Sequence, residues 1–216
     1  MEFLDGRNLI QVISAARRRR QAISFPVVAL IIAKVARAME LAWNVPGPDG
    51  EPARIIHRDI SPENVVLTYD GEVKLVDFGL SKQNVRSAVE GASSYCGTPE
   101  YLAPEVMTDP ANRSYGTAID WWSLGALVYE MLTGLPPWYS RDRETLFNGI
   151  KHGELTFPAF VSVPARDILT HFLCRDPLKR LGVQGGIDQI RKYPFFHGLD
   201  WKKLVAKELI PPWLPS

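Results

Sequence analysis

The stretch from residue 57 to residue 79 constrains the fold of this 216-residue chain more than any other. A polar segment, His-Arg-Asp-Ile-Ser-Pro-Glu-Asn (57–64), precedes two short apolar runs that an Asp-Gly pair separates. Asp-Gly between two such runs favours a tight β-hairpin turn. We expect this hairpin to bring three polar side chains, Asp59, Asn64 and Asp77, to neighbouring loop ends.

These three side chains have the chemistry of a combined metal and proton site. An amide and one carboxylate can hold a divalent metal through oxygen, which leaves the other carboxylate free to accept a proton. Aspartate and asparagine also commonly cap turns. Taken alone, Asp59 and Asn64 are therefore open to a catalytic or a structural interpretation.

At these residues the chain resembles a protein kinase. Residues 57–64 are similar to the HRD-x4-N catalytic loop, and Asp-Phe-Gly at 77–79 is similar to the metal loop. The resemblance implies that Asp59 orients a substrate hydroxyl and accepts its proton, that Asn64 and Asp77 hold Mg²⁺, and that ATP is the phosphoryl donor.

The first nine residues resemble the hinge between the two lobes of a kinase. They start as a strand and end in a polar turn. The resemblance implies that Glu2 and Leu4 meet the adenine of ATP through backbone groups and that Val66 and Val76 contact the same cleft. The glycine-rich loop and lysine of the small lobe lie upstream of this match, so we expect the isolated chain to be nearly inactive.

The chain carries two family resemblances. Ser61 stands where eukaryotic serine/threonine kinases usually have a lysine that stabilises the γ-phosphate. Residues 1–82 resemble bacterial, myxobacterial-type serine/threonine kinases, in which serine is common at this place. From about residue 83 the chain resembles the AGC kinases, and residues 198–216 resemble the start of their C-terminal tail.

Residues 93–105, Ser-Ser-Tyr-Cys-Gly-Thr-Pro-Glu-Tyr-Leu-Ala-Pro-Glu, are similar to the AGC activation segment. Ser94 occupies the position of the activating phosphate in that group, which implies an upstream activating kinase. A phosphate there would gain charge-assisted hydrogen bonds from Arg58 and Lys82. The alternative is an ordinary loop serine.

The resemblance also implies a set of substrate contacts. Thr98 is expected to hydrogen-bond toward Asp59 and to favour a serine or threonine acceptor. Glu63 and Glu130 match positions that hold an arginine two residues before the acceptor, so we expect a protein substrate with basic residues. Asn8 replaces a glutamate that binds the arginine three before, which weakens that preference. The pocket for the residue after the acceptor is expected to contain Tyr95, Pro99 and Leu102.

Four further residues have expected structural roles. Asp120 would accept hydrogen bonds from the backbone of the catalytic loop at residues 57 and 58. Glu105 would form an ion pair with Arg180, which is costly to break from one side if it is buried. Thr117 and Asp120 also resemble a helix capping box, with an acid in place of the usual Glu or Gln.

Helical spacing predicts helices over residues 9–22, 25–43, 117–132, 141–153 and 163–174. The third of these helices is apolar nearly all round and should be buried, with Gly134 ending it. The expected fold is α+β and mainly helical: a kinase-like C-terminal lobe over 1–197 with a small β-hairpin. The four arginines at 17–20 are interpreted as a solvated helix end; a docking patch is the alternative.

Composition excludes several other classes of function. The formal net charge of +1 gives no reason to expect nucleic acid or a membrane as a partner. Two cysteines, Cys96 and Cys174, fit a reducing compartment, so we expect a cytoplasmic protein. The apolar run at 25–33 is too short to span a bilayer.

The alternative to an enzyme is a non-catalytic, pseudokinase-like module that binds basic peptides.

Overall fold

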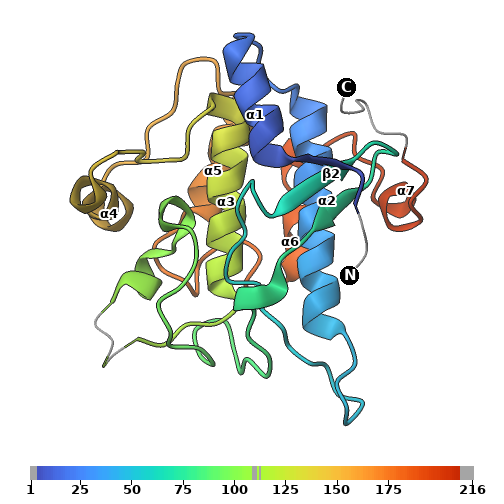
Figure 1. Ribbon diagram of the computed structural model, residues 1–216, viewed down its shortest axis with the longest axis vertical. Coiled ribbons are helices and arrows are strands. Elements are labelled where there is room, and N and C mark those ends of the chain that lie inside the picture. The colour runs from blue at the N-terminus through green and yellow to red at the C-terminus, as the bar shows by residue number, and fades with distance from the viewer. Residues whose placement is uncertain (1–3, 109–110, 112, 210–216) are drawn as a thin grey trace.

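The computed structural model describes residues 4–108, 111 and 113–209 (Figure 1). The predicted α+β fold, mainly helical with a small sheet, is confirmed. In the described residues the helices and strands are β1 (Gly6–Asn8), α1 (Leu9–Arg18), α2 (Phe25–Asn44), β2 (Val65–Thr68), β3 (Val73–Leu75), α3 (Ala118–Thr133), α4 (Arg143–His152), α5 (Val163–Phe172), α6 (Gly186–Ile190) and α7 (Trp201–Val205).

Helix α3 forms the centre of the molecule. Every residue from Ala118 to Val128 is buried, as its apolar sequence predicts. It contacts α2 on one side and α5 on the other, and Figure 1 shows α2 and α3 running side by side. A side chain at Gly125 would come within 2.6 Å of Phe172 of α5, so glycine permits this close packing. Gly134 ends α3 with a φ of 88°, which a glycine adopts without strain.

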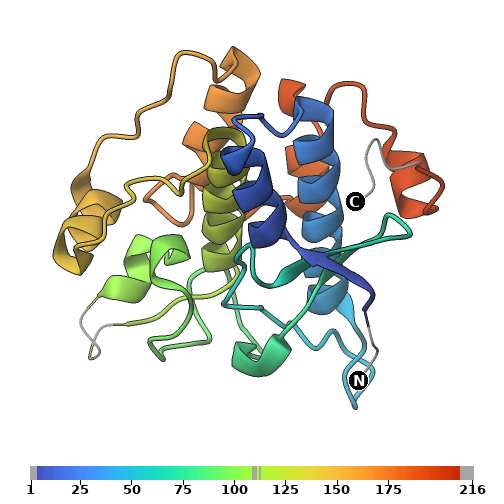
Figure 2. The ribbon, with the colours of Figure 1, turned by 45° about the horizontal axis from the view of Figure 1, so that its top comes forward.

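The small sheet has the order β1-β2-β3 and is antiparallel throughout. It lies across α2, as Figures 1 and 2 both show. Lys34 of α2 holds the hairpin by donating to the carbonyl of Gly71 at 3.2 Å and by pairing with Glu72 at 3.6 Å. The predicted hairpin is therefore fixed on a buried helix, and the loops at its two ends are fixed with it.

Two boundaries near the N-terminus differ from the sequence prediction. The first strand covers residues 6–8, which were predicted to be a polar turn, because these residues pair with β2 in the register Gly6 to Thr68. Helix α1 ends at Arg18 instead of residue 22. Arg20 takes a φ of 54°, a left-handed conformation that cannot continue a helix.

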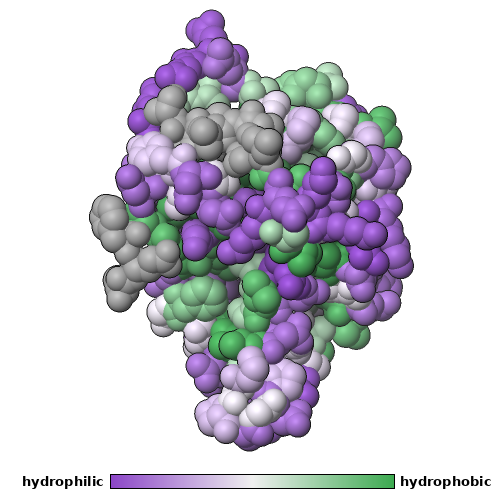
Figure 3. Space-filling view, turned by 90° about the vertical axis from the view of Figure 1, so that its right-hand side faces the viewer, coloured by the Kyte–Doolittle hydropathy of each residue, from purple (hydrophilic) through white to green (hydrophobic). Residues whose placement is uncertain are grey.

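The other helices end within two residues of their predicted bounds. No described helix is both long enough and apolar enough to cross a membrane. On the face that Figure 3 presents, hydrophobic side chains lie in separate areas between hydrophilic ones.

Candidate active site

The carboxylate of Asp120 holds the loop at 57–64 through hydrogen bonds to its backbone. One oxygen of its carboxylate accepts the backbone N–H of His57 at 2.7 Å, and the other accepts that of Arg58 at 2.9 Å. These are the two hydrogen bonds that the sequence predicts. Burial raises the pKa of Asp120, whereas the two amide donors favour its charged form. Arg58 has a φ of 72°, and this hydrogen bonding helps to hold the strained turn.

The predicted capping box at Thr117 is absent. Thr117 has helical dihedral angles and makes no side-chain cap to α3. The carboxylate of Asp120 cannot reach back to the start of its own helix because both of its oxygens bind the backbone of another segment. A residue that looked like a local helix signal therefore makes a contact across 63 residues of chain.

Asp59 is fixed by hydrogen bonds to both carboxylate oxygens. Its Oδ1 accepts the backbone N–H of Thr98 at 2.9 Å and the Thr98 hydroxyl at 2.7 Å. Its Oδ2 accepts from the side-chain amide of Asn64 at 2.9 Å. The predicted hydrogen bond between Thr98 and Asp59 is thus present. Asp59 is half-buried, so it remains open to a substrate hydroxyl.

Asn64 and Asp77 both keep an oxygen available for a metal. The Asn64 amide nitrogen donates to the backbone and the side chain of Asp59, which leaves its oxygen unused by these bonds. Oδ1 of Asp77 accepts the N–H of Gly79, and Oδ2 remains. The N–H of Val76 donates to the carbonyl of Asn64 at 2.9 Å, so the two loops are joined next to these side chains.

This donor set fits Mg²⁺, a hard cation that is usually held by one or two protein oxygens together with water and phosphate oxygens. In the described residues no group of three or more His, Cys, Asp or Glu side chains could hold a metal.

His57 connects the two loops, a role that its place in the motif did not reveal. Its Nε2–H donates to the carbonyl of Val76 at 2.9 Å, and its Nδ1 accepts the N–H of Asp59 at 3.3 Å. The edge of its ring contacts Phe78, with ring centroids 4.7 Å apart. The sequence carries no signal for this role, because it depends on the burial of the imidazole, and a buried histidine needs partners for both nitrogens.

The residues expected to contact adenine lie around the hairpin. Val66 and Val76 are half-buried, and Leu4 is half-buried just before β1. Glu2 falls outside the described residues. Asp77 and the three residues after it are exposed, so the metal loop has an open side.

Ser94 is exposed, and its hydroxyl accepts from Arg58 Nη1 at 2.6 Å. Tyr115 joins the same cluster, since its hydroxyl donates to the carbonyl of Ser94 and accepts from Arg58 at 3.3 Å. Lys82 does not join it: within the described part of the chain, Lys82 bonds only through its backbone, to Ile56. The bridge fixes only the backbone of residue 82, so a contact between its ammonium group and a phosphate on Ser94 stays a prediction.

Glu63 and Glu130 line one cavity of about 200 Å³, together with Thr98. We call it the acidic cavity, because Glu100 also lines it. The cavity includes Tyr101, whose hydroxyl donates to the Glu130 carboxylate. Burial raises the pKa of Glu130 to about 7, and Glu63 and Glu100 add to the rise by repulsion.

Three members of this cavity, Glu100, Tyr101 and Arg17, were not predicted from the sequence. Glu100 and Tyr101 stand next to the predicted pocket residue Pro99, but their direction follows from the short helix Pro99–Tyr101. Arg17 of α1 also lines the cavity and lowers the pKa of Glu130 slightly. The acidic cavity therefore already contains one cation from its own chain.

The remaining predicted substrate residues differ in exposure. Tyr95 is exposed and its hydroxyl accepts from Arg143 at 3.3 Å, whereas Leu102 is buried and Pro99 is half-buried. Asn8 caps α1, because its side chain accepts the N–H of Gln11 at 3.2 Å and its own N–H donates to the Gln11 side chain at 3.3 Å. The neutral Asn8 thus has a structural role in addition to the predicted one.

The ion pair expected between Glu105 and Arg180 is present. Arg180 donates to both carboxylate oxygens, at 2.6 and 2.9 Å, and also to the carbonyls of Cys174 and Ala118. Its side chain has no exposed surface. This pair fixes the segment that follows Thr98 to the body of the molecule.

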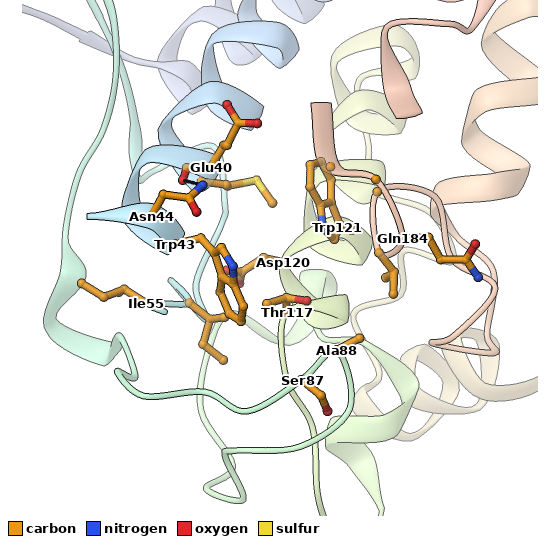
Figure 4. A pocket seen from close by; sticks show the side chains of 16 residues that line it. Glu40, Trp43, Asn44, Ile55, Ser87, Ala88, Thr117, Asp120, Trp121 and Gln184 are labelled. Carbon is orange, nitrogen blue, oxygen red and sulfur yellow. Dashed lines mark hydrogen bonds between the residues drawn. The ribbon is translucent and has the colours of Figure 1, made fainter. Parts of the chain in front are cut away.

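A second cavity, of about 350 Å³, lies behind the catalytic loop. Figure 4 shows Trp43 of α2 and Trp121 of α3 on two sides of it, with Asp120 between them. Asp120, which accepts the backbone N–H groups of residues 57 and 58, also lines this cavity. The cavity and the acidic cavity have no described lining residue in common.

Comparison with known proteins shows the family to which this fold belongs. The protein kinase domain matches residues 1–196. The chain belongs to the protein kinase family.

Three relatives illustrate the similarity. The "RAC family serine/threonine-protein kinase homolog" of Dictyostelium discoideum is 44% identical over 162 residues, which is 75% of this chain and 35% of that protein. "Serine/threonine-protein kinase YPK1" of Saccharomyces cerevisiae is 46% identical over 75% of this chain and 23% of that protein. "Protein kinase C" of Drosophila melanogaster is 35% identical over the whole chain and 27% of that protein. The chain thus spans about a quarter to a third of these relatives.

Proposed function

We propose that this chain supplies the catalytic loop, the metal loop and the substrate surface of a serine/threonine protein kinase. Residues 1–197 act as its large lobe, and residues 198–216 begin the tail. One observation carries the proposal: Asp59 is bonded at both oxygens by Thr98 and Asn64. A carboxylate held in this way is oriented in advance for a hydroxyl that approaches it.

Asp59 then orients the acceptor hydroxyl and takes its proton while the hydroxyl oxygen attacks the γ-phosphorus of ATP, the bond to the β,γ-bridging oxygen breaks, and ADP leaves. The hydroxyl of Thr98, 2.7 Å from Asp59, closes one side of the carboxylate and favours a serine or threonine acceptor. Asn64 and Asp77 would hold Mg²⁺ through side-chain oxygens. When bound, the metal neutralises the charge on the transferring phosphoryl group. Leu4, Val66 and the backbone near Glu2 bind adenine.

The substrate is a protein with basic residues near the acceptor. The acidic cavity supports this proposal, because Glu63, Glu100 and Glu130 lie beside Thr98, and Thr98 contacts Asp59. A guanidinium group would gain charge-assisted hydrogen bonds there. Tyr95, Pro99 and Leu102 contact the residue after the acceptor. The proposed use of ATP supports a location inside the cell.

An experiment on acceptor chemistry tests this function. The chain is produced as one polypeptide in which a protein-kinase small lobe precedes residue 1, and transfer from γ-labelled ATP is measured with three peptides. The peptides have the same basic sequence and differ in a Ser, Thr or Tyr acceptor. We expect label on the Ser and Thr peptides in the presence of Mg²⁺. Label on the Tyr peptide alone would contradict the role given to Thr98.

A second candidate, a non-catalytic module that binds basic peptides, is favoured by a different observation. The lining of the acidic cavity includes neither Asn64 nor Asp77, the residues proposed to hold Mg²⁺, so a peptide can bind there without a nucleotide. In this case the basic peptide binds equally well with and without Mg-ATP, and the fused polypeptide transfers no label. Transfer that requires Asp59 would exclude this candidate.

A further inference from the structure

A groove of about 630 Å³ lies along α1, on the helix that also borders the acidic cavity. Its lining comes from β1, from α1 and from the turn between β2 and β3, which Figure 1 shows next to each other. The lining residues are Gly6, Arg7, Ile10, Gln11, Ser14, Arg18 and Tyr69. Because the only charged residues among its described lining residues are arginines, we call it the cationic groove.

The two arginines of this groove are available to a ligand. Arg7 and Arg18 are exposed, and within the described ranges neither side chain has an ion pair or a hydrogen bond. Other arginines of the chain are used internally, such as Arg180 with Glu105 and Arg37 with Glu40. Two unpaired cations in one concavity attract an anion, and guanidinium groups bind carboxylates bidentately.

Neutral groups in the groove complete the set of donors. Gln11 uses its side-chain oxygen to accept the N–H of Asn8, so its amide N–H groups remain as donors. Ser14 adds a hydroxyl. Asp5 and Asp70 are sequence neighbours of the lining residues Gly6 and Tyr69, but they do not line the groove, and Asp70 binds the hydroxyl of Thr68.

The cationic groove and the acidic cavity lie back to back on one helix. Ile10 and Ser14 line both of them. One side of α1 therefore carries unpaired positive charge, and the other faces Glu63, Glu100 and Glu130. A ligand that used both sites would need opposite charges in two parts of its chain.

We propose that the cationic groove docks an acidic segment of the same protein substrate whose basic acceptor segment enters the acidic cavity. This inference rests on the proposed function for the basic segment only. Docking of two segments of one chain raises the overall affinity, because the second contact becomes intramolecular. The substrate class is then a protein with an acidic stretch at a distance from a basic acceptor site.

A nucleic acid fits this surface less well than an acidic peptide does. The groove offers two arginines, whereas proteins that bind the phosphate backbone commonly contact six to ten phosphates. The adjacent acidic cavity would repel a phosphate chain that continued past Ser14. The formal net charge of +1 gives no general attraction for polyanions.

Fluorescence anisotropy with the 216-residue chain tests the proposal. Three labelled peptides are compared: an acidic peptide, a basic peptide with a serine acceptor, and the two joined by a flexible Gly-Ser linker. We expect the acidic peptide to bind, and we expect its affinity to fall as the NaCl concentration rises. The joined peptide should bind at least about tenfold more tightly than the basic peptide alone. A joined peptide that binds no more tightly than the basic peptide would overturn the proposal.

A pair of charge-matched variants locates the site. The double variant Arg7→Glu with Arg18→Glu should lower the affinity for the acidic peptide about tenfold, because two attractions become repulsions. Arg19→Glu with Arg20→Glu makes the same change in net charge at the end of the same helix, outside the groove, and should weaken it less than about threefold. Equal losses in both variants would overturn the groove as the site, and thermal unfolding of each variant checks its fold.

Two further arms separate the alternatives. The double variant Glu63→Gln with Glu100→Gln should lower the affinity for the basic peptide and leave the affinity for the acidic peptide unchanged. If the basic peptide is unaffected but the acidic peptide still needs Arg7 and Arg18, the proposed substrate site fails while the docking site stands. A single-stranded oligonucleotide that binds more tightly than the acidic peptide would overturn the assignment to a peptide.

Discussion

Arg180 donates two hydrogen bonds to the carboxylate of Glu105, at 2.6 and 2.9 Å, across 75 residues of chain. The arginine is fully buried and the glutamate nearly so. This pair fastens the segment that carries Thr98 and Ser94 to the region after α5, so two distant parts of the sequence support the site together.

Arg180→Met should destabilise the chain strongly. The substitution leaves the Glu105 carboxylate partly buried without its partner, which costs about 3–5 kcal/mol. Urea unfolding followed by circular dichroism measures the loss. Arg191→Met is the control, because Arg191 and Asp188 form an exposed pair whose removal should cost less than about 1 kcal/mol. Equal losses in the two variants would contradict the structural role of the buried pair.

The acidic cavity should bind a basic peptide more tightly as pH rises through 7. Burial raises the pKa of Glu130 from 4.5 to about 7, so this carboxyl is largely neutral below that pH and attracts a cation less. Peptide affinity measured from pH 5.5 to 8.5 should therefore increase with pH. Glu130→Gln should flatten this dependence, and an unchanged pH profile in that variant would assign the effect to another group.

The same group should act on stability in the opposite direction. The folded state binds the Glu130 proton more tightly than the unfolded state does, since the folded pKa is raised. Its contribution to stability is thus fully present below pH 4.5 and is lost as pH rises toward 7. Relative to the native chain, Glu130→Gln should gain stability over this interval, measured by urea unfolding at each pH.

Gly182→Ala should destabilise the fold by a steric clash in the wall of the cavity behind the catalytic loop. A Cβ atom at Gly182 would lie 2.2 Å from the ring of Trp121. Gly198→Ala is a matched control, because Gly198 has nearly the same φ, 90° against 93°, with nothing within 4 Å of the added atom. We expect Gly182→Ala to cost about 1–3 kcal/mol more than Gly198→Ala. Equal unfolding midpoints would contradict the packing of Trp121 on Gly182.

A phosphate on Ser94 should stabilise the chain through Arg58. The Ser94 hydroxyl already lies 2.6 Å from Arg58 Nη1, so a phosphate needs little rearrangement to form a charge-assisted bond worth about 1.5–3 kcal/mol. Unfolding of protein that carries phosphoserine at 94 is compared with protein that carries it at 93. A gain at Ser94 that matched that at Ser93, or that survived Arg58→Ala, would count against this contact.

The motifs allowed much of the site to be predicted, because their spacing encodes contacts that a fold must satisfy. Asp59 with Thr98, Asp120 with the backbone of residues 57 and 58, and Glu105 with Arg180 all join segments far apart in sequence. The hairpin and the buried central helix followed from local patterns, namely Asp-Gly between apolar runs and an apolar surface all round the helix.

The contacts that the sequence did not predict depend on how distant segments pack together. Asp120 lost its local capping role because its carboxylate binds another segment. The run of arginines at 17–20 looked uniform in sequence, but α1 turns Arg17 toward the acidic cavity and Arg18 toward the cationic groove.

The most direct test of the central claim is the rate of phosphoryl transfer with Asp59→Asn. It is measured in the polypeptide that joins a kinase small lobe to this chain, with a basic serine peptide and Mg-ATP. Asparagine can keep the hydrogen bond from Thr98 but cannot accept the substrate proton, so we expect the rate to fall by about 10²–10⁴-fold. Peptide binding and thermal unfolding should change little, and Asp49→Asn in an exposed loop should retain full activity. A transfer rate unchanged by Asp59→Asn would contradict the account.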